Sequence, residues 1–146
     1  VPADLSAVSE LGIASKATWD YSPEEMAVFR EELTLTETLL QELADAQVAD
    51  VAGQIVGYFT LRLHEGGIFE LEHLFVSPLH FARGIGSALV AKSRESAQRL
   101  GATELKIYSD PNSTEFYLRF GAQVTGVHES SIPGRQIPIL TMPVSN

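Results

Sequence analysis

The fold of this chain is decided by one stretch, LFVSPLHFARGIGSAL at residues 74–89. An apolar segment ends at Pro78, a loop follows, and Gly84 and Gly86 open an amphipathic helix. Glycine has no Cβ, so a ligand can approach the unpaired N–H groups of the first helical turn, where the helix dipole favours an anion. The stretch therefore predicts a diphosphate site with Arg83 as a nearby cation. Without a ligand, the same glycines would only ease a tight turn between strand and helix.

Upstream of this stretch, apolar and polar residues alternate, which is typical of strands. The segments 48–51, 55–63 and 68–77 show this pattern, with turns at Gly53-Gln54 and at residues 64–67. Short turns join antiparallel neighbours. We therefore predict an antiparallel meander ahead of the glycine loop.

Downstream, a helical pattern runs from Gly84 to Gly101, and a short strand follows at residues 103–108. Because a strand–helix–strand crossover within one sheet is right-handed, the two strands should be parallel. A short helix is expected from Pro111 to about Phe120, before two final strands at residues 123–128 and 136–142. Pro138 lacks an N–H, so the last strand should be bulged or lie at an edge there.

The first third of the chain has helical spacing at residues 4–16 and 36–44. Between them, Ser22-Pro23-Glu24-Glu25 combines a capping box with proline at the first helical position, which predicts a helix start. The sequence contains no repeat or linker. Residues 1–146 therefore predict a single α/β domain.

Composition narrows the function classes. The 146 residues are 45% apolar and 20% charged, as in a soluble globular domain. The absence of cysteine excludes disulfides, thiolate metal sites and a cysteine acyl-enzyme. The net charge of −9 disfavours nucleic acid as a partner and would attract a cationic small molecule. No apolar run reaches the ~20 residues of a membrane span, and no export signal is visible, so we expect a cytoplasmic protein that does not bind membranes.

The glycine loop could also belong to a dinucleotide-binding fold. That fold requires a third glycine where this chain has Leu89, and it requires parallel strands before the loop rather than a meander. The dinucleotide hypothesis therefore fails on both counts.

Two blocks in this order carry a resemblance to a known family. The first is the meander with its glycine loop, and the second runs from Asp110 to Tyr117 ahead of Arg119-Phe120-Gly121-Ala122. Over residues 48–142 the chain resembles the GNAT superfamily of acetyl-CoA-dependent N-acetyltransferases. The resemblance implies a mixed, mostly antiparallel central sheet flanked by helices, with a splayed parallel strand pair at the cofactor site. The family's first strand normally precedes the first helix, so here it is either trimmed or absent.

The resemblance also implies an activity. We expect transfer of an acetyl group from acetyl-CoA to a primary amine of a small molecule or peptide, by direct attack in a ternary complex, in a protein that pairs as a homodimer. The alternative is a non-catalytic domain that senses acyl-CoA or mediates an interaction. The expected cofactor contacts are the backbone of Leu74, Phe75 and Val76, the loop Phe81, Ala82, Arg83, Gly84, Ile85, Gly86 and Ser87, and the side chains of Asn112 and Tyr117. Phe81 stands where the family usually has Arg or Gln.

Candidate catalytic groups lie on the strand before the loop. Glu70 and Glu72 should share one face with Leu74 and Val76 unless a bulge intervenes, and either could take the proton of the amine. Both could equally be ordinary surface carboxylates. His73 should point to the opposite face, as a structural histidine.

The second block supplies a candidate acid. The resemblance implies that the Tyr117 hydroxyl protonates the sulfur of CoA and that Asn112 holds the cofactor arm. The alternative is a core aromatic at Tyr117 and a helix cap at Asn112.

Two loops could bind the acceptor. Trp19 and Tyr21 lie between the first helices and could contact a cation, although a lone Trp on a loop is also typical of a hydrophobic lid. Arg135, in the last loop, could meet a substrate carboxylate or simply a surface acid. The histidines show no metal-ligand spacing, so we predict no metal site.

Overall fold

The computed structural model describes residues 5–19, 21–78, 84–129 and 136–144. The helices are α1 Leu5–Ala17, α2 Pro23–Leu33, α3 Glu37–Glu42, α4 Ile85–Arg99 and α5 Thr114–Leu118. The strands are β1 Asp45–Val51, β2 Gln54–His64, β3 Ile68–Val76, β4 Glu104–Tyr108, β5 Gln123–Glu129 and β6 Gln136–Pro143. None of the helices in these ranges is both long enough and apolar enough to cross a membrane.

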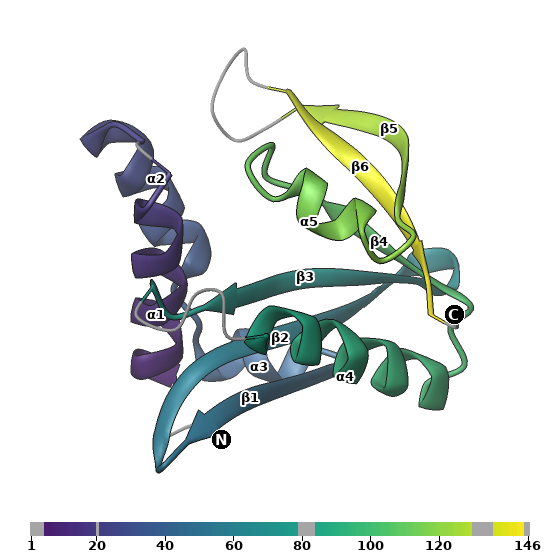
Figure 1. Cartoon of the computed structure of the whole chain (residues 1–146), viewed down its shortest axis with the longest axis horizontal. Helices are drawn as coiled ribbons and strands as arrows, with labels where there is room; N and C mark the ends of the chain where they lie inside the picture. Colours follow the sequence, from purple (N-terminus) through teal and green to yellow (C-terminus); the bar gives the residue numbers. More distant parts are fainter. Residues whose placement is uncertain (1–4, 20, 79–83, 130–135, 145–146) are drawn as a thin grey trace.

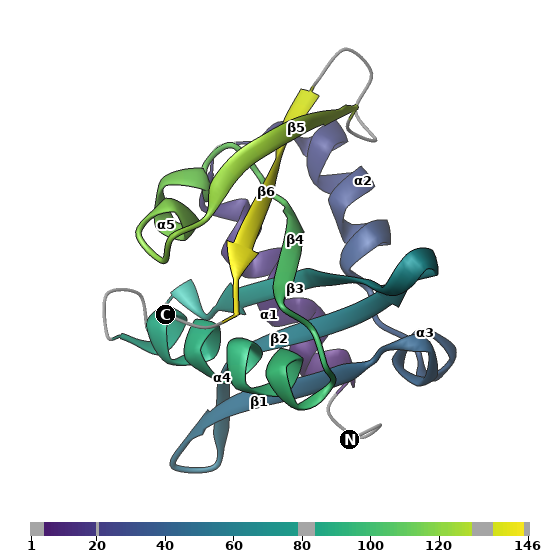
Figure 2. The same cartoon turned by 90° about the vertical axis from the view of Figure 1, so that its right-hand side faces the viewer.

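The described strands form one six-stranded sheet in the order β1-β2-β3-β4-β6-β5. Every neighbouring pair is antiparallel except β3 and β4, which are parallel. The predicted mixed, mostly antiparallel sheet with one parallel pair is therefore confirmed. In Figures 1 and 2, α4 lies against one face of the sheet, while α1 and α2 stand together against the other.

Local sequence accounts for the clearest element starts. Ser22 Oγ accepts the Glu25 N–H at 3.1 Å, and the Glu25 carboxylate accepts the Ser22 N–H at 2.9 Å, so the predicted capping box starts α2. The turn between β1 and β2 consists of Ala52 and Gly53, whose φ angles are 54° and 84°. Two positive φ angles match the twist of a two-residue hairpin.

Two helix boundaries and the place of Pro138 differ from the predictions. The helix predicted at residues 36–44 ends at Glu42, because the Ala44 N–H donates to the Leu61 carbonyl and starts the sheet. The helix predicted from Pro111 begins only at Thr114. Pro138 lies on β6, which is an internal strand of the sheet. The last pair between β4 and β6 is Tyr108 with Ile139, the residue that follows Pro138. At Pro138 itself, β6 therefore has a strand partner only in β5.

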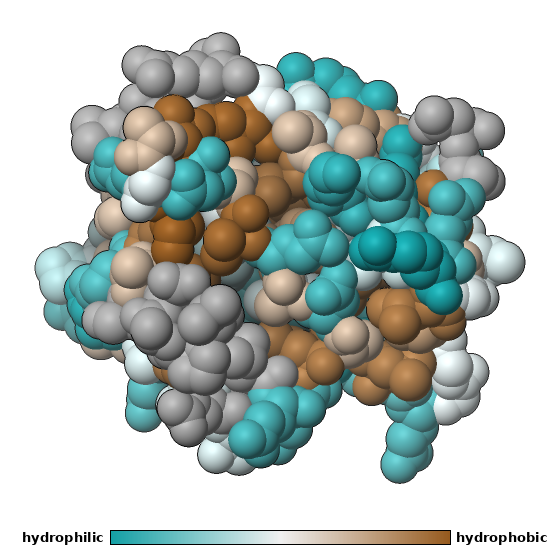
Figure 3. Space-filling model, turned by 90° about the horizontal axis from the view of Figure 1, so that it is seen from below, coloured by the Kyte–Doolittle hydropathy of each residue, from teal (hydrophilic) through white to brown (hydrophobic). Residues whose placement is uncertain are grey.

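The main core lies between the sheet and helices α4 and α5. It contains the fully buried side chains of Phe59, Leu61, Val90, Leu105 and Leu140. Smaller clusters join α1 and α2 to the opposite face through Tyr58 and Phe75. On the face shown in Figure 3, hydrophobic areas are separated by hydrophilic side chains. Burial of the core fixes the sheet between two helical layers, and the site lies where that sheet opens.

Candidate functional site

The opening lies between the parallel strands β3 and β4. Within the described residues these strands pair at a single position, Glu70 with Lys106. Beyond it β3 continues to Val76 bonded only to β2, while β4 continues to Tyr108 bonded only to β6. The β3 edge that faces β4 therefore presents unpaired backbone groups, which can bind an extended ligand. This is the splayed pair that the family resemblance implies.

A β-bulge in β3 decides which side chains face the site. Thr60 pairs with His73, and the next residue, Leu61, pairs with Leu71, so Glu72 is the extra residue. The bulge reverses the alternation of faces along the strand. The expected common face of Glu70 and Glu72 with Leu74 and Val76 is therefore wrong.

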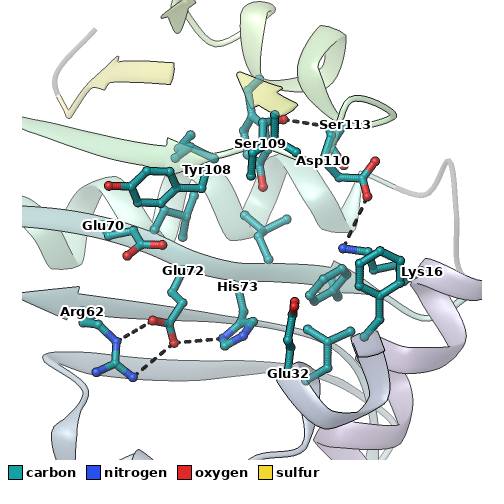
Figure 4. Close-up of a pocket in the computed structure, with 18 of the residues that line it drawn as sticks. Lys16, Glu32, Arg62, Glu70, Glu72, His73, Tyr108, Ser109, Asp110 and Ser113 are labelled. Carbon is teal, nitrogen blue, oxygen red and sulfur yellow. Dashed lines mark hydrogen bonds and ion pairs between the residues drawn. The ribbon is translucent and has the colours of Figure 1, made fainter. Parts of the chain in front are cut away.

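The face assignment follows from the register. Arg62 pairs with Glu70 and Thr60 pairs with His73, and residues two apart on β2 share a face. Glu70 and His73 therefore lie on the same face of the sheet, toward α1 and α2. His73 was expected on the opposite face from Glu70, and the bulge explains this error too. Figure 4 shows Glu72 and His73 side by side, with Arg62 beyond Glu72.

On this face lies a cavity of about 520 Å³, which we name the acidic cavity after its carboxylates. Its charged lining consists of Glu32, Glu70, Glu72, Asp110, Lys16 and Arg62. Arg62 Nε lies 2.5 Å from a Glu72 oxygen, and Lys16 Nζ lies 3.3 Å from Asp110 Oδ2. Carboxylates outnumber these cations, so the cavity favours a positively charged guest.

Glu70 is the most buried of the acidic groups on β3, with 7% of its surface exposed. Its carboxylate lies 2.5 Å from His64 Nε2. Burial raises the pKa of Glu70, and the hydrogen bond from His64 only partly opposes this shift. A carboxylate with a raised pKa is a better proton acceptor near neutral pH.

His73 also lines the acidic cavity, and its ring Nδ1 lies 2.8 Å from the Thr60 hydroxyl. Burial lowers the pKa of His73, so its ring is neutral at physiological pH. Opposite the β3 carboxylates, the rings of Tyr108 and His128 lie 5.0 Å apart and form another part of the wall.

A second cavity of about 410 Å³ lies at the start of α4, and we name it the glycine-loop cavity. Residues 84–87, Leu74, Phe75, Val76 and Asn112 contribute to its lining. Gly84 has φ 76°, a left-handed conformation that favours glycine. At Gly86, a Cβ would lie 3.1 Å from Phe116 Cζ, so this glycine also admits an aromatic ring. The predicted contacts at Phe81, Ala82 and Arg83 lie outside the described residues.

The two cavities share part of their lining, namely Trp19, Leu74, Phe75, Ser113 and Tyr117. They therefore meet beside the open edge of β3. Tyr117 lines both cavities and is only 6% exposed. Burial raises the pKa of Tyr117, so the hydroxyl is protonated at neutral pH.

The other predicted site residues have distinct places. Trp19 lines both cavities, whereas within the described part of the chain Tyr21 contributes to neither and instead donates to Asp110 Oδ2 at 2.5 Å. Asn112 lines the glycine-loop cavity; it is not the cap of α5, a position that Ser113 takes. Arg135 lies outside the described residues. Within the described ranges, no group of three or more His, Asp or Glu side chains is arranged to hold a metal ion.

Sequence reasoning missed Asp110, Tyr108 and Lys16 as parts of the site. Asp110 follows the end of β4, where the carboxyl ends of two parallel strands open, and that position could have indicated it. Lys16 could not be found this way, because its partner lies far away in the sequence.

Comparisons with known proteins agree with this geometry. Residues 17–142 match the family described as the acetyltransferase (GNAT) domain. A GCN5-related N-acetyltransferase from Rhodopseudomonas palustris has a TM-score of 0.78 at 22% identity, covering 97% of this chain and 89% of that one. A GNAT-family acetyltransferase from Desulfovibrio desulfuricans has a TM-score of 0.78 at 21% identity, covering 99% and 95%.

The PaiA N-acetyltransferase from Thermoplasma acidophilum, solved in complex with coenzyme A, has a TM-score of 0.72 at 20% identity, with 97% and 93% covered. At these identities the likeness to solved structures shows the fold alone. A search of curated protein sequences found no significant match.

Proposed function

This chain belongs to the GNAT acetyltransferase family, and on that premise we propose that it moves the acetyl group of acetyl-CoA to a primary amine of a small molecule or peptide. One observation carries the proposal. Two cavities of different chemistry meet at the open edge of β3, beside the buried hydroxyl of Tyr117.

The glycine-loop cavity suits CoA. The diphosphate of CoA would accept hydrogen bonds from the first N–H groups of α4, where the helix dipole also favours an anion. The pantetheine arm would lie along the unpaired edge of β3 at Leu74, Phe75 and Val76, with Asn112 beside it. The coenzyme A complex of the T. acidophilum relative supports this assignment. Phe81, Ala82 and Arg83 belong to the same loop by sequence, and we keep them as proposed contacts.

The acidic cavity suits the amine. Acceptor amines are mostly protonated at neutral pH, and the carboxylates of this cavity would attract the ammonium form. Glu70, directly or through a water, would take one proton so that the nitrogen lone pair is free. Glu72 is the second candidate base, and its carboxylate forms an ion pair with Arg62.

In the transfer itself, the amine nitrogen forms a bond to the acetyl carbonyl carbon and the carbon–sulfur bond breaks. A backbone N–H of the β3 edge would stabilise the negative charge on the carbonyl oxygen. Tyr117 would give its proton to the departing sulfur. One amine proton reaches solvent through the base, and the other replaces the proton that Tyr117 has lost.

Two measurements test this function. Calorimetry should detect binding of CoA and acetyl-CoA, and a thiol assay with a panel of mono- and polyamines should detect release of free CoA. Binding without release on any amine would instead support the sensor hypothesis. Absence of binding would contradict both. Pairing of two subunits and a cytoplasmic location remain predictions.

A further inference from the structure

The carboxylate of Asp110 binds two side chains from the first helices, far away in the sequence, as well as its near neighbour Asn112. Its Oδ2 accepts the Tyr21 hydroxyl at 2.5 Å and lies 3.3 Å from Lys16 Nζ. Its Oδ1 accepts the backbone N–H of Asn112 at 2.9 Å and the side-chain Nδ2 of Asn112 at 2.8 Å. We name these four residues the Asp110 clasp.

The clasp determines how the Asn112 amide is oriented. A carboxylate can only accept hydrogen bonds, so the amide nitrogen must face Asp110. The same nitrogen lies 3.3 Å from the Tyr21 oxygen, which strengthens this assignment. The amide oxygen therefore points away from Asp110. Since Asn112 lines the glycine-loop cavity, this oxygen is the atom that a bound molecule can reach as an acceptor.

The clasp also holds the segment between α1 and α2. Lys16 and Tyr21 flank Trp19, which lines both cavities. Lys16 Nζ lies 3.9 Å from the centre of the Phe29 ring, and Tyr21 packs edge-on against Phe29 at 4.7 Å. Asp110 thus connects the helices beside the acidic cavity to the loop beside the glycine-loop cavity.

Asp110 is ionised in this environment. Burial opposes its ionisation, but the hydrogen bonds from Tyr21 and Asn112 and the charge of Lys16 outweigh burial and lower its pKa. Hydrogen bonds to a charged acceptor are stronger than neutral ones, so the clasp restrains Asn112 firmly.

We propose that Asp110 is a positioning residue for the cofactor: it turns the Asn112 amide so that its oxygen accepts an amide N–H of the pantetheine arm. The inference rests on the proposed function, because it takes CoA as the ligand of the glycine-loop cavity. Asp110 itself faces the acidic cavity and acts on CoA through Asn112.

The test compares two ligands by calorimetry on the whole chain. One is CoA, and the other is 3′-phosphoadenosine 5′-diphosphate, which keeps the diphosphate but lacks the pantetheine amides. Asp110→Asn should raise the Kd of CoA about tenfold, roughly the loss of the one hydrogen bond that Asn112 makes with CoA. The Kd of the fragment should stay unchanged. Glu10→Gln is the matched control. It breaks the exposed ion pair between Glu10 in α1 and Arg30 in α2, and neither of these residues lines the acidic cavity or the glycine-loop cavity, so neither Kd should change.

A double variant separates positioning from general loosening. Asn112 is exposed, so Asn112→Ala should fold and should itself weaken CoA. If Asp110 acts through Asn112, adding Asp110→Asn to Asn112→Ala weakens CoA no further. Equal weakening of CoA and fragment, an unchanged CoA Kd in Asp110→Asn, or full additivity would each overturn the inference. Failure of the unmodified protein to bind CoA would overturn the proposed function instead.

Discussion

Glu70 and Lys106 form the single paired position between β3 and β4 in the part of the chain that the structure describes. Glu70 thus lies at the point from which the two parallel strands diverge, on the face that carries the acidic cavity. Glu70 is therefore largely buried, yet it still lines the acidic cavity. Its chemistry should differ from that of Glu72, which the bulge directs to Arg62.

We expect Glu70→Gln to lower kcat by about 10²- to 10⁴-fold, the usual contribution of a general base. Because burial raises the pKa of Glu70, the acid limb of the kcat profile should lie above the ordinary range of a glutamate and should vanish in the variant. Rates measured between pH 5 and 9 test this. If Glu72→Gln removes the limb and Glu70→Gln does not, Glu72 is the base.

The same raised pKa affects stability. The folded chain holds the Glu70 proton more tightly than the unfolded chain, so the free energy of unfolding should fall as pH rises from about 4.5 through the folded pKa. Urea titrations should show this fall in the unmodified protein and not in Glu70→Gln. An identical pH dependence in both proteins would contradict the raised pKa.

Tyr117→Phe isolates the proposed acid. The ring stays in the core, so the free energy of unfolding and the Kd of CoA should hardly change. Loss of the proton donor should lower kcat by about 10²-fold. Steady-state rates and calorimetry on one preparation measure both effects. An undiminished kcat would show that the sulfur leaves without this hydroxyl.

Gly86→Ala should act through Phe116. The added Cβ would lie 3.1 Å from Phe116 Cζ, so the ring must move by a few tenths of an ångström. Phe116 lines the glycine-loop cavity, and its displacement should weaken CoA several-fold, by roughly 1 kcal/mol of lost fit. Phe116→Leu in the same background should restore part of the affinity. A double variant no better than Gly86→Ala would place the effect elsewhere.

His73 should titrate below its ordinary pKa of 6.5, because burial disfavours the charged ring. The unfolded chain then binds this proton more readily than the folded chain. The free energy of unfolding should therefore be unaffected by His73 above pH 6.5 and should fall as the pH drops from 6.5 toward the folded pKa. Two-dimensional NMR of the ring measures the pKa directly. A pKa at or above the ordinary value would contradict this burial.

Local patterns predicted most of the elements because their causes are local. The capping box of Ser22 and Glu25 starts α2, and the turn predicted at Gly53-Gln54 lies one residue earlier, at Ala52-Gly53. The left-handed Gly84 marks the start of α4. Each involves neighbours within a few residues, so the chain's own alternation of apolar, polar and glycine positions indicates it.

The faces of β3 could not be predicted in this way. Whether Glu70 shares a face with Leu74 depends on one extra residue at Glu72, and the position of a bulge depends on how β2 and β3 pair along their whole length. The sequence shows a continuous strand pattern through this point.

By itself, then, the sequence determined the order of helices and strands, the parallel crossover and the glycine-rich start of α4, because neighbouring residues are enough to decide them. Only the tertiary structure decided that β3 and β4 separate after Glu70, that two cavities meet at Tyr117, and that Asp110 joins Tyr21 across 89 residues of chain. These features depend on burial and hydrogen bonds between segments that become neighbours only when the sheet is assembled.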